Sequence, residues 1–248
     1  MKLTLTEPRF LKESVGIISD LVNEVVIKVN NDGLEITAMD PANVALVMFK
    51  LLSSSFVEYE LNENVNLAVS LENLKQVLKR AKPSDTVILQ LDKDKNKLDI
   101  HLKGESYRKF SLALIDLDDS DSKSPKLEFK HSVDIPSIAL DEAVEDMSII
   151  AESVSLLLNK EKLTVQSNSN LNSVKVDIVN GLNINLGSEE EILKSKYSLE
   201  YLKKMIKGSK LTDTAKLSFG NDYPMRLDYT VTDRMQLSFI LAPRVDND

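Results

Sequence analysis

A chain of 248 residues with 42% hydrophobic and 28% charged residues has enough apolar material for two packed domains, which excludes a disordered protein. The absence of cysteine excludes disulfides and thiolate sites, and the net charge of −8 argues against nucleic acid unless basic side chains gather on one face. No apolar run approaches the roughly 20 residues of a membrane-spanning helix. Because Met1 leads into the chain without an apolar signal core, we expect a cytoplasmic protein without a membrane partner.

The first predicted helix lies in LKESVGIISDLV, which starts at Leu11, because its apolar residues recur at the helical period. A hairpin is predicted in VVIKVNNDGLEI, where two alternating stretches flank the turn signal Asp32-Gly33. The next segment, ANVALVMF, predicts a further strand.

The segment SLENLKQVLKRAKPSDTVILQL, which starts at Ser70, predicts a second helix with two stripes. At about 100° per residue, its leucines form an apolar stripe. The stripe beside it is basic and consists of Lys75, Lys79 and Lys82, with Arg80 further round. The alternating segments TVILQL, KLDIHL and YRKFSLALI then predict strands.

The segment IDLDDSDSKSPKLEF is rich in Asp, Ser and Lys and contains Pro125, which is typical of a linker. We place this linker at residues 116–127, between domains at 1–115 and 128–246. Its clustered carboxylates could instead bind a hard cation. The glycine and terminal glutamate of a calcium loop are missing, so a hydrated acidic linker is favoured.

The second half repeats the first at a nearly constant offset. LDEAVEDMSIIA matches the first helix, VSLLLNKEKLTV matches the hairpin, and SLEYLKKMIKGSKLTDTAKLSF matches the basic helix. The basic stripe recurs as Lys203, Lys207 and Lys210, with Lys204 added. NSVKVDIV, KLSF, PMRLDYTV and MQLSFILA predict strands. The predicted fold class is therefore a duplicated α+β fold, with two helices of each half on one face of an antiparallel sheet.

Helical lysines are usually a solvated face, but two copies in register on an acidic chain favour a functional positive surface. His101 and His131 lie in alternating segments without cysteine or a second histidine nearby, which favours structural roles. The glycines form neither a dinucleotide fingerprint nor a phosphate loop. We therefore expect no enzyme activity, no metal and no cofactor.

Five motifs in order resemble the archaeal and eukaryotic sliding clamp family, proliferating cell nuclear antigen: GLEITAMDPANVALV, SLENLKQVLKRAKPSDTVIL, SLEYLKKMIK, FGNDYPMRLDY and FILAPRV. The short acidic tail VDND is nearer to the archaeal form. The resemblance implies a ring of three subunits, identical or mixed, whose helices surround duplex DNA. It also implies that DNA polymerase, a clamp loader, flap endonuclease and DNA ligase bind through short peptides.

The resemblance places these basic residues on the inner, DNA-facing surface: Lys12, Lys75, Lys79, Arg80, Lys82, Lys203, Lys204, Lys207 and Lys210. It places these residues in a partner pocket: Met39, Asn43, Val44, Leu46, Leu117, Pro224, Ile240, Leu241, Ala242 and Pro243. Partners would insert a helical turn with an aliphatic and two aromatic residues, and a glutamine nearby. We expect the apolar floor to consist of Leu46, Ile240 and Leu241.

Two departures from the family pattern bear on these sites. Ser122 and Ser124 stand at linker positions that are often aliphatic, which predicts a polar wall of the pocket. The third helix is acidic, with Asp141, Glu142, Glu145 and Asp146, and Asp141 stands where the first half has Lys12.

Ring closure in the family implies that YRKFSLALI pairs as an edge strand with NSVKVDIV of a neighbouring subunit. A duplicated protein-binding scaffold that does not encircle DNA is the alternative function. An enzyme is the least favoured class.

Overall fold

The computed structural model describes residues 1–117, 126–169, 171–187 and 190–244. The chain divides into two compact units. Unit 1 comprises Met1–Pro41, Val47–Ser124 and Thr230–Leu237, and unit 2 comprises Ala42–Leu46, Pro125–Tyr229 and Ser238–Asp248. Helices on antiparallel strands confirm the duplicated α+β fold class, whereas the predicted domain boundaries stay a prediction. Among the described residues, no helix is long and apolar enough to cross a membrane.

The strands of unit 1 form two antiparallel arrays, in the hydrogen-bonded orders β5-β1-β7-β8-β9 and β4-β3-β2-β6. The helices are α1 (Arg9–Ile18), α2 (Leu71–Lys79) and the short 3-10 helix η1 (Ser53–Ser55). The strands are β1 (Lys2–Leu5), β2 (Glu24–Asn30), β3 (Gly33–Met39), β4 (Ala45–Leu52), β5 (Glu58–Glu60), β6 (Val65–Ser70), β7 (Thr86–Asp92), β8 (Lys97–Lys103) and β9 (Tyr107–Ala113).

Unit 2 repeats this plan strand for strand, in the orders β14-β10-β16-β17-β18 and β13-β12-β11-β15. Its helices are α3 (Ser137–Met147), α4 (Leu199–Met205) and the 3-10 helix η2 (Ile206–Lys210). The strands are β10 (Ser132–Pro136), β11 (Ser153–Leu158), β12 (Leu163–Asn168), β13 (Ser173–Ile178), β14 (Asn183–Asn185), β15 (Leu193–Ser198), β16 (Thr214–Ser218), β17 (Met225–Val231) and β18 (Met235–Leu241).

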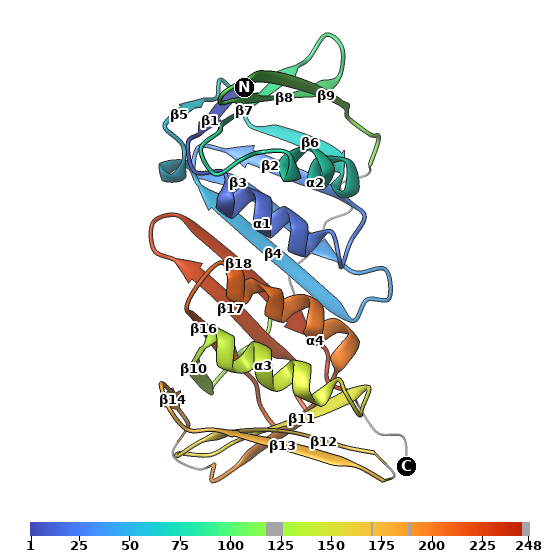
Figure 1. Cartoon of the computed structure of the whole chain (residues 1–248), viewed down its shortest axis with the longest axis vertical. Coiled ribbons are helices and arrows are strands. Elements are labelled where there is room, and N and C mark those ends of the chain that lie inside the picture. Colours follow the sequence, from blue (N-terminus) through green and yellow to red (C-terminus); the bar gives the residue numbers. More distant parts are fainter. Residues whose placement is uncertain (118–125, 170, 188–189, 245–248) are drawn as a thin grey trace. The chain divides into compact units, whose positions relative to one another are not determined.

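Each unit buries the apolar stripes of its helix pair. In unit 1, α1 and α2 lie side by side (Figure 1), and Leu11 and Leu74 are almost completely buried. In unit 2, α3 contacts α4, and Leu140 and Leu202 are buried in the same way. The predicted helical stripes are therefore confirmed, since these residues recur at the period that places them on one helix face.

The predicted hairpin at Asp32-Gly33 joins β2 to β3. The Asn30 side-chain oxygen Oδ1 accepts hydrogen bonds from the backbone N–H of Asp32 at 2.8 Å and of Gly33 at 3.2 Å. Gly33 has a φ of 153°, and a Cβ at this position would lie 2.2 Å from the Leu51 carbonyl oxygen. The turn therefore requires glycine because a strand backbone approaches it closely.

Both basic helices end earlier than the predicted stripes. The prediction that the helix of unit 1 extends to Lys82 is wrong, because α2 ends at Lys79. Lys82 precedes Pro83, which disfavours the helical conformation, and its N–H donates to Asp85 Oδ2 at 2.9 Å. In unit 2, α4 ends at Met205, and Lys207 and Lys210 lie in the 3-10 helix η2.

Candidate functional site

The basic residues of unit 1 that lie between its two helices also hold these helices together. Lys75 Nζ lies 3.0 Å from Asp20 Oδ1, and the two side chains are 18% and 26% exposed. Lys12, on α1, donates from Nζ to the carbonyl oxygen of Ala81 at 3.0 Å, just beyond the end of α2. Both lysines therefore have protein partners in addition to any ligand that they contact.

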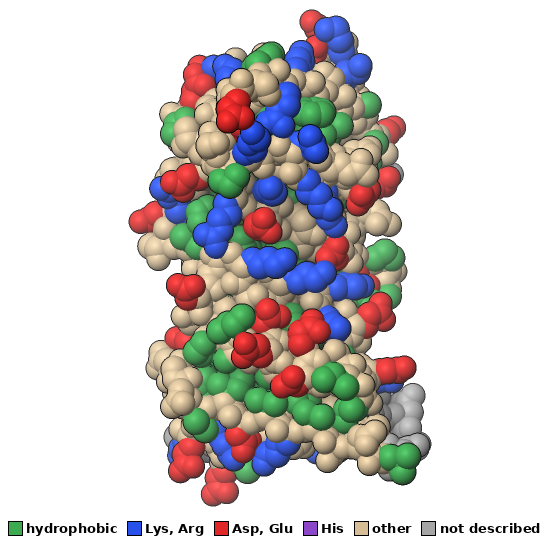
Figure 2. All heavy atoms as spheres, viewed as in Figure 1, with side chains coloured by type: hydrophobic (Ala, Val, Ile, Leu, Met, Phe, Trp, Pro, Cys, Tyr) green, Lys and Arg blue, Asp and Glu red, His purple; other side chains and the backbone are tan. Residues whose placement is uncertain are grey.

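The other basic residues of unit 1 lie at the end of α2 and are exposed. Lys79 is the last helical residue and Arg80 is the C-cap. Lys82 Nζ lies 2.7 Å from Glu105 Oε2, but both side chains are largely exposed, so this ion pair contributes little stability. Figure 2 shows Lys and Arg side chains gathered over the α1 and α2 region of this unit.

The basic residues of unit 2 lie on α4 and η2. Lys203 Nζ lies 3.2 Å from Glu145 Oε2 and 3.2 Å from Ser148 Oγ. Lys204 Nζ lies 3.5 Å from Glu200 Oε1 and 5.3 Å from the centre of a neighbouring tyrosine ring. The residues on η2 that the sequence singled out, Lys207 and Lys210, are exposed.

The third helix gives unit 2 a mixed charge. Glu142, Glu145 and Asp146 are exposed, and Figure 2 shows acidic side chains among hydrophobic ones over α3. Asp141 Oδ2 accepts a hydrogen bond from Ser209 Oγ at 3.0 Å. The acidic side chains expected on this helix are therefore exposed. They lie on the side of unit 2 that its helices cover, where the basic residues of α4 also lie.

The expected partner residues of unit 2 come together at the start of β4 and the end of β18. The Ala242 N–H donates to the Val44 carbonyl oxygen at 3.0 Å. Asn43 is exposed with a φ of 56°, and Val44, Pro224, Ala242 and Pro243 are half-buried. In unit 1, the expected partner residues Met39 and Leu117 are also half-buried.

The predicted apolar floor differs from the observed side-chain directions. Leu46, Ile240 and Leu241 are only 1%, 7% and 0% exposed. Neighbouring residues of a strand point to opposite faces, so Ile240 and Leu241 cannot both face one peptide. Leu241 shares its face with Phe239, whose ring lies 6.5 Å from that of Tyr229, and the Tyr229 ring in turn lies against Gly208 of η2. Leu241 is therefore a core residue and not an accessible floor.

The linker and its serines lie largely outside the described residues, which exclude 118–125 and thus Ser122 and Ser124. The same holds for most of the acidic run DLDDSD. Within the described ranges, no group of three or more His, Asp or Glu residues could hold a metal ion.

Both histidines have hydrogen-bond partners that fit the structural roles expected for them. His101 Nδ1 lies 2.5 Å from Tyr107 Oη, and burial lowers the pKa of His101. His131 Nδ1 accepts the Gly187 N–H at 3.0 Å.

The predicted edge strand of unit 1, β9, lies at the end of its array. The matching strand of unit 2 is β18, because both strands have a serine that donates to an aspartate of the preceding strand. Ser111 Oγ donates to Asp99 at 2.5 Å, and Ser238 Oγ donates to Asp228. Leu112 of β9 is only half-buried, whereas its counterpart on β18, Phe239, is completely buried.

The predicted edge strand of unit 2, β13, lies at the end of the other array. Val174 and Val176 are half-buried, whereas their counterparts on β4, Val47 and Phe49, are almost completely buried. Both edges thus have apolar side chains that an added strand would cover, together with unpaired backbone groups that it would satisfy.

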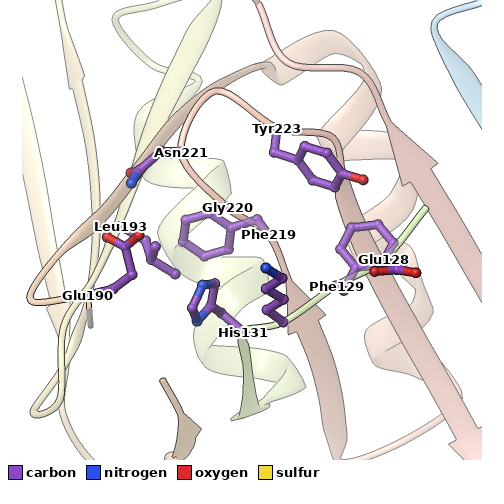
Figure 3. Close-up of a pocket in the computed structure, with 10 residues that line it drawn as sticks. Glu128, Phe129, His131, Glu190, Leu193, Phe219, Gly220, Asn221 and Tyr223 are labelled. Atoms are coloured by element: carbon purple, nitrogen blue, oxygen red, sulfur yellow. The ribbon is translucent and has the colours of Figure 1, made fainter. Parts of the chain in front are cut away.

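Unit 2 also contains a cavity of about 430 Å³, which Figure 3 shows and which no sequence pattern indicated. We call it the unit 2 pocket. Its lining comes from residues 128–131, from Glu190 and Leu193, and from residues 219–223. These segments lie far apart in the sequence, so no local spacing could reveal that they share a cavity.

Comparison with known proteins relates both halves of the chain to one protein family. The family model for the N-terminal domain of proliferating cell nuclear antigen matches residues 1–123, and that for its C-terminal domain matches residues 123–244. A DNA polymerase sliding clamp of Nanoarchaeum equitans is 32% identical over 99% of this chain and 100% of the relative. One of Thermococcus gammatolerans is 33% identical over 94% of this chain and 93% of the relative.

A solved structure agrees with these relatives. The crystal structure of PCNA from Thermococcus kodakaraensis matches with a TM-score of 0.91 and 27% identity, over 98% of this chain and 99% of the other. The fold, both domain matches and the full-length relatives lead to the same assignment. The chain belongs to the proliferating cell nuclear antigen family.

Proposed function

We propose that this chain assembles with two further subunits into a closed ring, and that the basic residues of α1, α2, α4 and η2 face the duplex inside it. The chain is a DNA sliding clamp that acts as a processivity factor for DNA polymerase. It acts without catalysis of its own, in the cytoplasm, where it is associated with chromosomal DNA.

A ring held by topology requires only weak contacts with DNA. The net charge of −8 discourages phosphate from binding the surface at large, while the helical lysines provide a local positive surface. Contacts between lysine and phosphate, direct or through water, orient the duplex without fixing its position. The acidic α3 reduces this attraction in unit 2 and makes the proposed inner surface uneven.

The observation that carries the ring proposal is the burial difference between matching strands. Apolar residues of β9 and β13 are half-buried, but their counterparts on β18 and β4 are buried. Pairing of β9 with β13 of a neighbouring subunit would cover both sets. Because this contact is head-to-tail, it closes into a ring when the rotation between subunits is suitable.

Retention on circular DNA tests the encirclement directly. The clamp is loaded onto circular duplex DNA and then separated by size before and after the DNA is cut once. We expect retention on the circle and loss from the linear form, together with elution of the free protein as a trimer. Equal retention on both forms, or none on the circle, would favour a protein-binding scaffold instead.

Proline substitution tests the pairing of the edges. Ser111→Pro and Leu112→Pro place the ring of proline at neighbouring positions of β9, of which one directs its N–H toward the open edge. We expect the variant that loses the outward N–H to remain folded by circular dichroism but to elute as a monomer. Val176→Pro tests β13 in the same way. A closed trimer in all three variants would contradict the pairing.

Charge removal tests the DNA face. Lys75, Lys79, Lys203 and Lys207 are changed together to Ala, and the control variant replaces exposed lysines outside the helices: Lys95, Lys103, Lys160 and Lys216. The slope of log affinity against log salt should decrease by about one for each lysine that no longer reaches a phosphate. The control should retain the slope of the unchanged protein. An unchanged slope in the first variant would mean that these lysines do not contact DNA and only form a solvated helix face.

We also propose that DNA polymerase, the clamp loader, flap endonuclease and DNA ligase bind through short peptides at Val44, Pro224, Ile240, Ala242 and Pro243. Ile240→Ala should weaken a glutamine–aliphatic–aromatic peptide by about 1–3 kcal/mol in calorimetry, because the peptide would bury less apolar surface. Ser122→Leu should leave the affinity unchanged or raise it. Normal binding to the Ile240 variant would contradict this position for the peptide.

A further inference from the structure

The unit 2 pocket is built from segments that the fold holds in place. The Lys194 N–H donates to Asn221 Oδ1 at 2.8 Å, which fixes one side of the loop between β16 and β17. The Tyr197 hydroxyl donates to the Tyr223 carbonyl oxygen at 2.7 Å, which fixes the other side. The pocket is therefore formed before any ligand arrives.

Its inner surface is apolar and aromatic. Phe219 is 1% exposed, and Figure 3 shows its ring among the side chains that line the pocket. The rings of Phe129 and Tyr223 meet edge to face, with centroids 5.8 Å apart. Figure 3 places these two rings on one side and Glu190 on the other. A long side chain with an aliphatic stem could therefore pack between an aromatic wall and a carboxylate.

The charged groups of the lining are Glu128, Glu190 and Lys130. His131 accepts the Gly187 N–H at Nδ1, which places the proton of a neutral ring on Nε2. The two carboxylates thus outnumber the single ammonium group, and this balance favours a cationic ligand. Lys130 is exposed, so its ammonium group can move into solvent when another cation enters.

We propose that the unit 2 pocket binds the side chain of an arginine or lysine that flanks the clamp-binding motif of a partner peptide. The stem would pack on the half-buried rings of Phe129 and Tyr223, and the cationic head would lie between these rings and Glu190. An arginine in this position combines a carboxylate contact with a cation–π contact. The proposal rests on the proposed function, because Tyr223 of the pocket directly precedes Pro224 of the expected peptide site.

Calorimetry with matched peptides tests the proposal. One peptide has the glutamine–aliphatic–aromatic motif alone, and others carry one arginine or one glutamine several residues before or after it. We expect one of the arginine peptides to bind about three- to tenfold more tightly than its glutamine control. Glu190→Gln should abolish this gain and leave the affinity for the motif peptide unchanged. Equal affinities for every arginine and glutamine pair would overturn the proposal.

The Lys130→Met variant should change the affinity for the arginine peptide in the opposite direction to Glu190→Gln. Removal of the competing ammonium group should increase the gain from arginine, whereas a ligand that is anionic would lose affinity. Loss of affinity for the arginine peptide in this variant would therefore overturn the proposal.

A second measurement separates the pocket from the peptide site. N-acetyl-arginine methylamide and its aspartate counterpart are titrated into the full chain while the aromatic NMR signals of Phe129 and Tyr223 are followed. The arginine compound should shift both signals, and Glu190→Gln should reduce these shifts. If it shifts them although the motif peptide does not bind, the pocket assignment stands and the peptide site fails. No shift, or shifts with the aspartate compound alone, would overturn the pocket proposal.

Discussion

The two units make the same helix–helix contact with opposite charge. In unit 1, Lys12 of the first helix donates to the backbone carbonyl oxygen of Ala81. In unit 2, the matching residue is Asp141, which accepts from the hydroxyl of Ser209 at the position that matches Ala81. Lys12 is a donor and needs only the backbone carbonyl oxygen of Ala81 as its acceptor. Asp141 is an acceptor and needs a donor, which the Ser209 hydroxyl provides. The duplication has therefore retained a hydrogen-bonded contact, and not a charge, at this point.

The largest expected effect concerns the last strand of unit 2. Leu241→Ala should decrease the free energy of unfolding by about 2–5 kcal/mol, because a fully buried leucine leaves a cavity. Leu114→Ala, at the matching position of unit 1, should cost about 1 kcal/mol, since Leu114 is half-buried. Urea unfolding measures both values. Equal losses would contradict the difference in burial between the two units.

A smaller effect is expected where unit 2 has the 3-10 helix η2. A Cβ at Gly208 would lie 2.3 Å from the Tyr229 ring, so Gly208→Ala should destabilise the protein by about 1–3 kcal/mol. The matching residue of unit 1 is Arg80, which is exposed, and Arg80→Ala should leave the urea midpoint nearly unchanged. A stable Gly208 variant would show that the ring of Tyr229 can move aside.

The inverted contact itself can be measured with a double-mutant cycle. Asp141→Ala, Ser209→Ala and the double variant should give a coupling free energy of about 0.5–1.5 kcal/mol, the usual net value of one hydrogen bond. Lys12→Met should decrease the free energy of unfolding by a similar amount. A coupling of zero would mean that Asp141 and Ser209 do not depend on each other for stability.

The smallest expected effect is the response of the two edges to acid. Lys162 and Thr164 lower the pKa of Asp177 to about 2, from its ordinary value of 3.8. Lys109 and Ser111 also lower the pKa of Asp99 in unit 1. A lowered pKa in the folded state stabilises the protein above the ordinary value, and this contribution is lost as the pH falls.

The window for Asp177 therefore lies between about pH 4 and pH 2. Asp177→Asn should be less stable than the unchanged protein at pH 5, and the two urea midpoints should converge as the pH falls through this window. Asp99→Asn should behave likewise. Midpoints that stay equally far apart at every pH would show that neither carboxylate has this role.

Much of the fold follows from local sequence signals. The helical period places Leu11 and Leu140 on buried faces, and the turn signal at Asp32-Gly33 predicts the hairpin. The helix ends were less predictable, because Lys82 leaves the helix through a contact with Asp85 and through the proline that follows it. Helix propensity accounts for the effect of the proline, but it cannot predict that Asp85 accepts a hydrogen bond from the Lys82 N–H.

The candidate site was predictable only in part. Lysine spacing identified the basic residues of the helices, but it could not show that Asp20 pairs with Lys75 or that Glu145 pairs with Lys203. Strand alternation already separates Ile240 from Leu241, whereas the family resemblance grouped them. The unit 2 pocket depends on long-range packing and has no sequence signature of its own.

Lys75 and Lys203 form ion pairs that would affect motion along DNA if both lysines face the duplex as proposed. On the proposed DNA face, a lysine that releases a phosphate can return to Asp20 or Glu145, at 3.0 Å and 3.2 Å, rather than to water alone. If these lysines face the duplex as proposed, the return to a carboxylate would partly offset the cost of leaving a phosphate and lower the barriers in the energy profile along the duplex axis. Diffusion of the clamp would then be limited mainly by hydrodynamic drag and only weakly by the spacing of the phosphates.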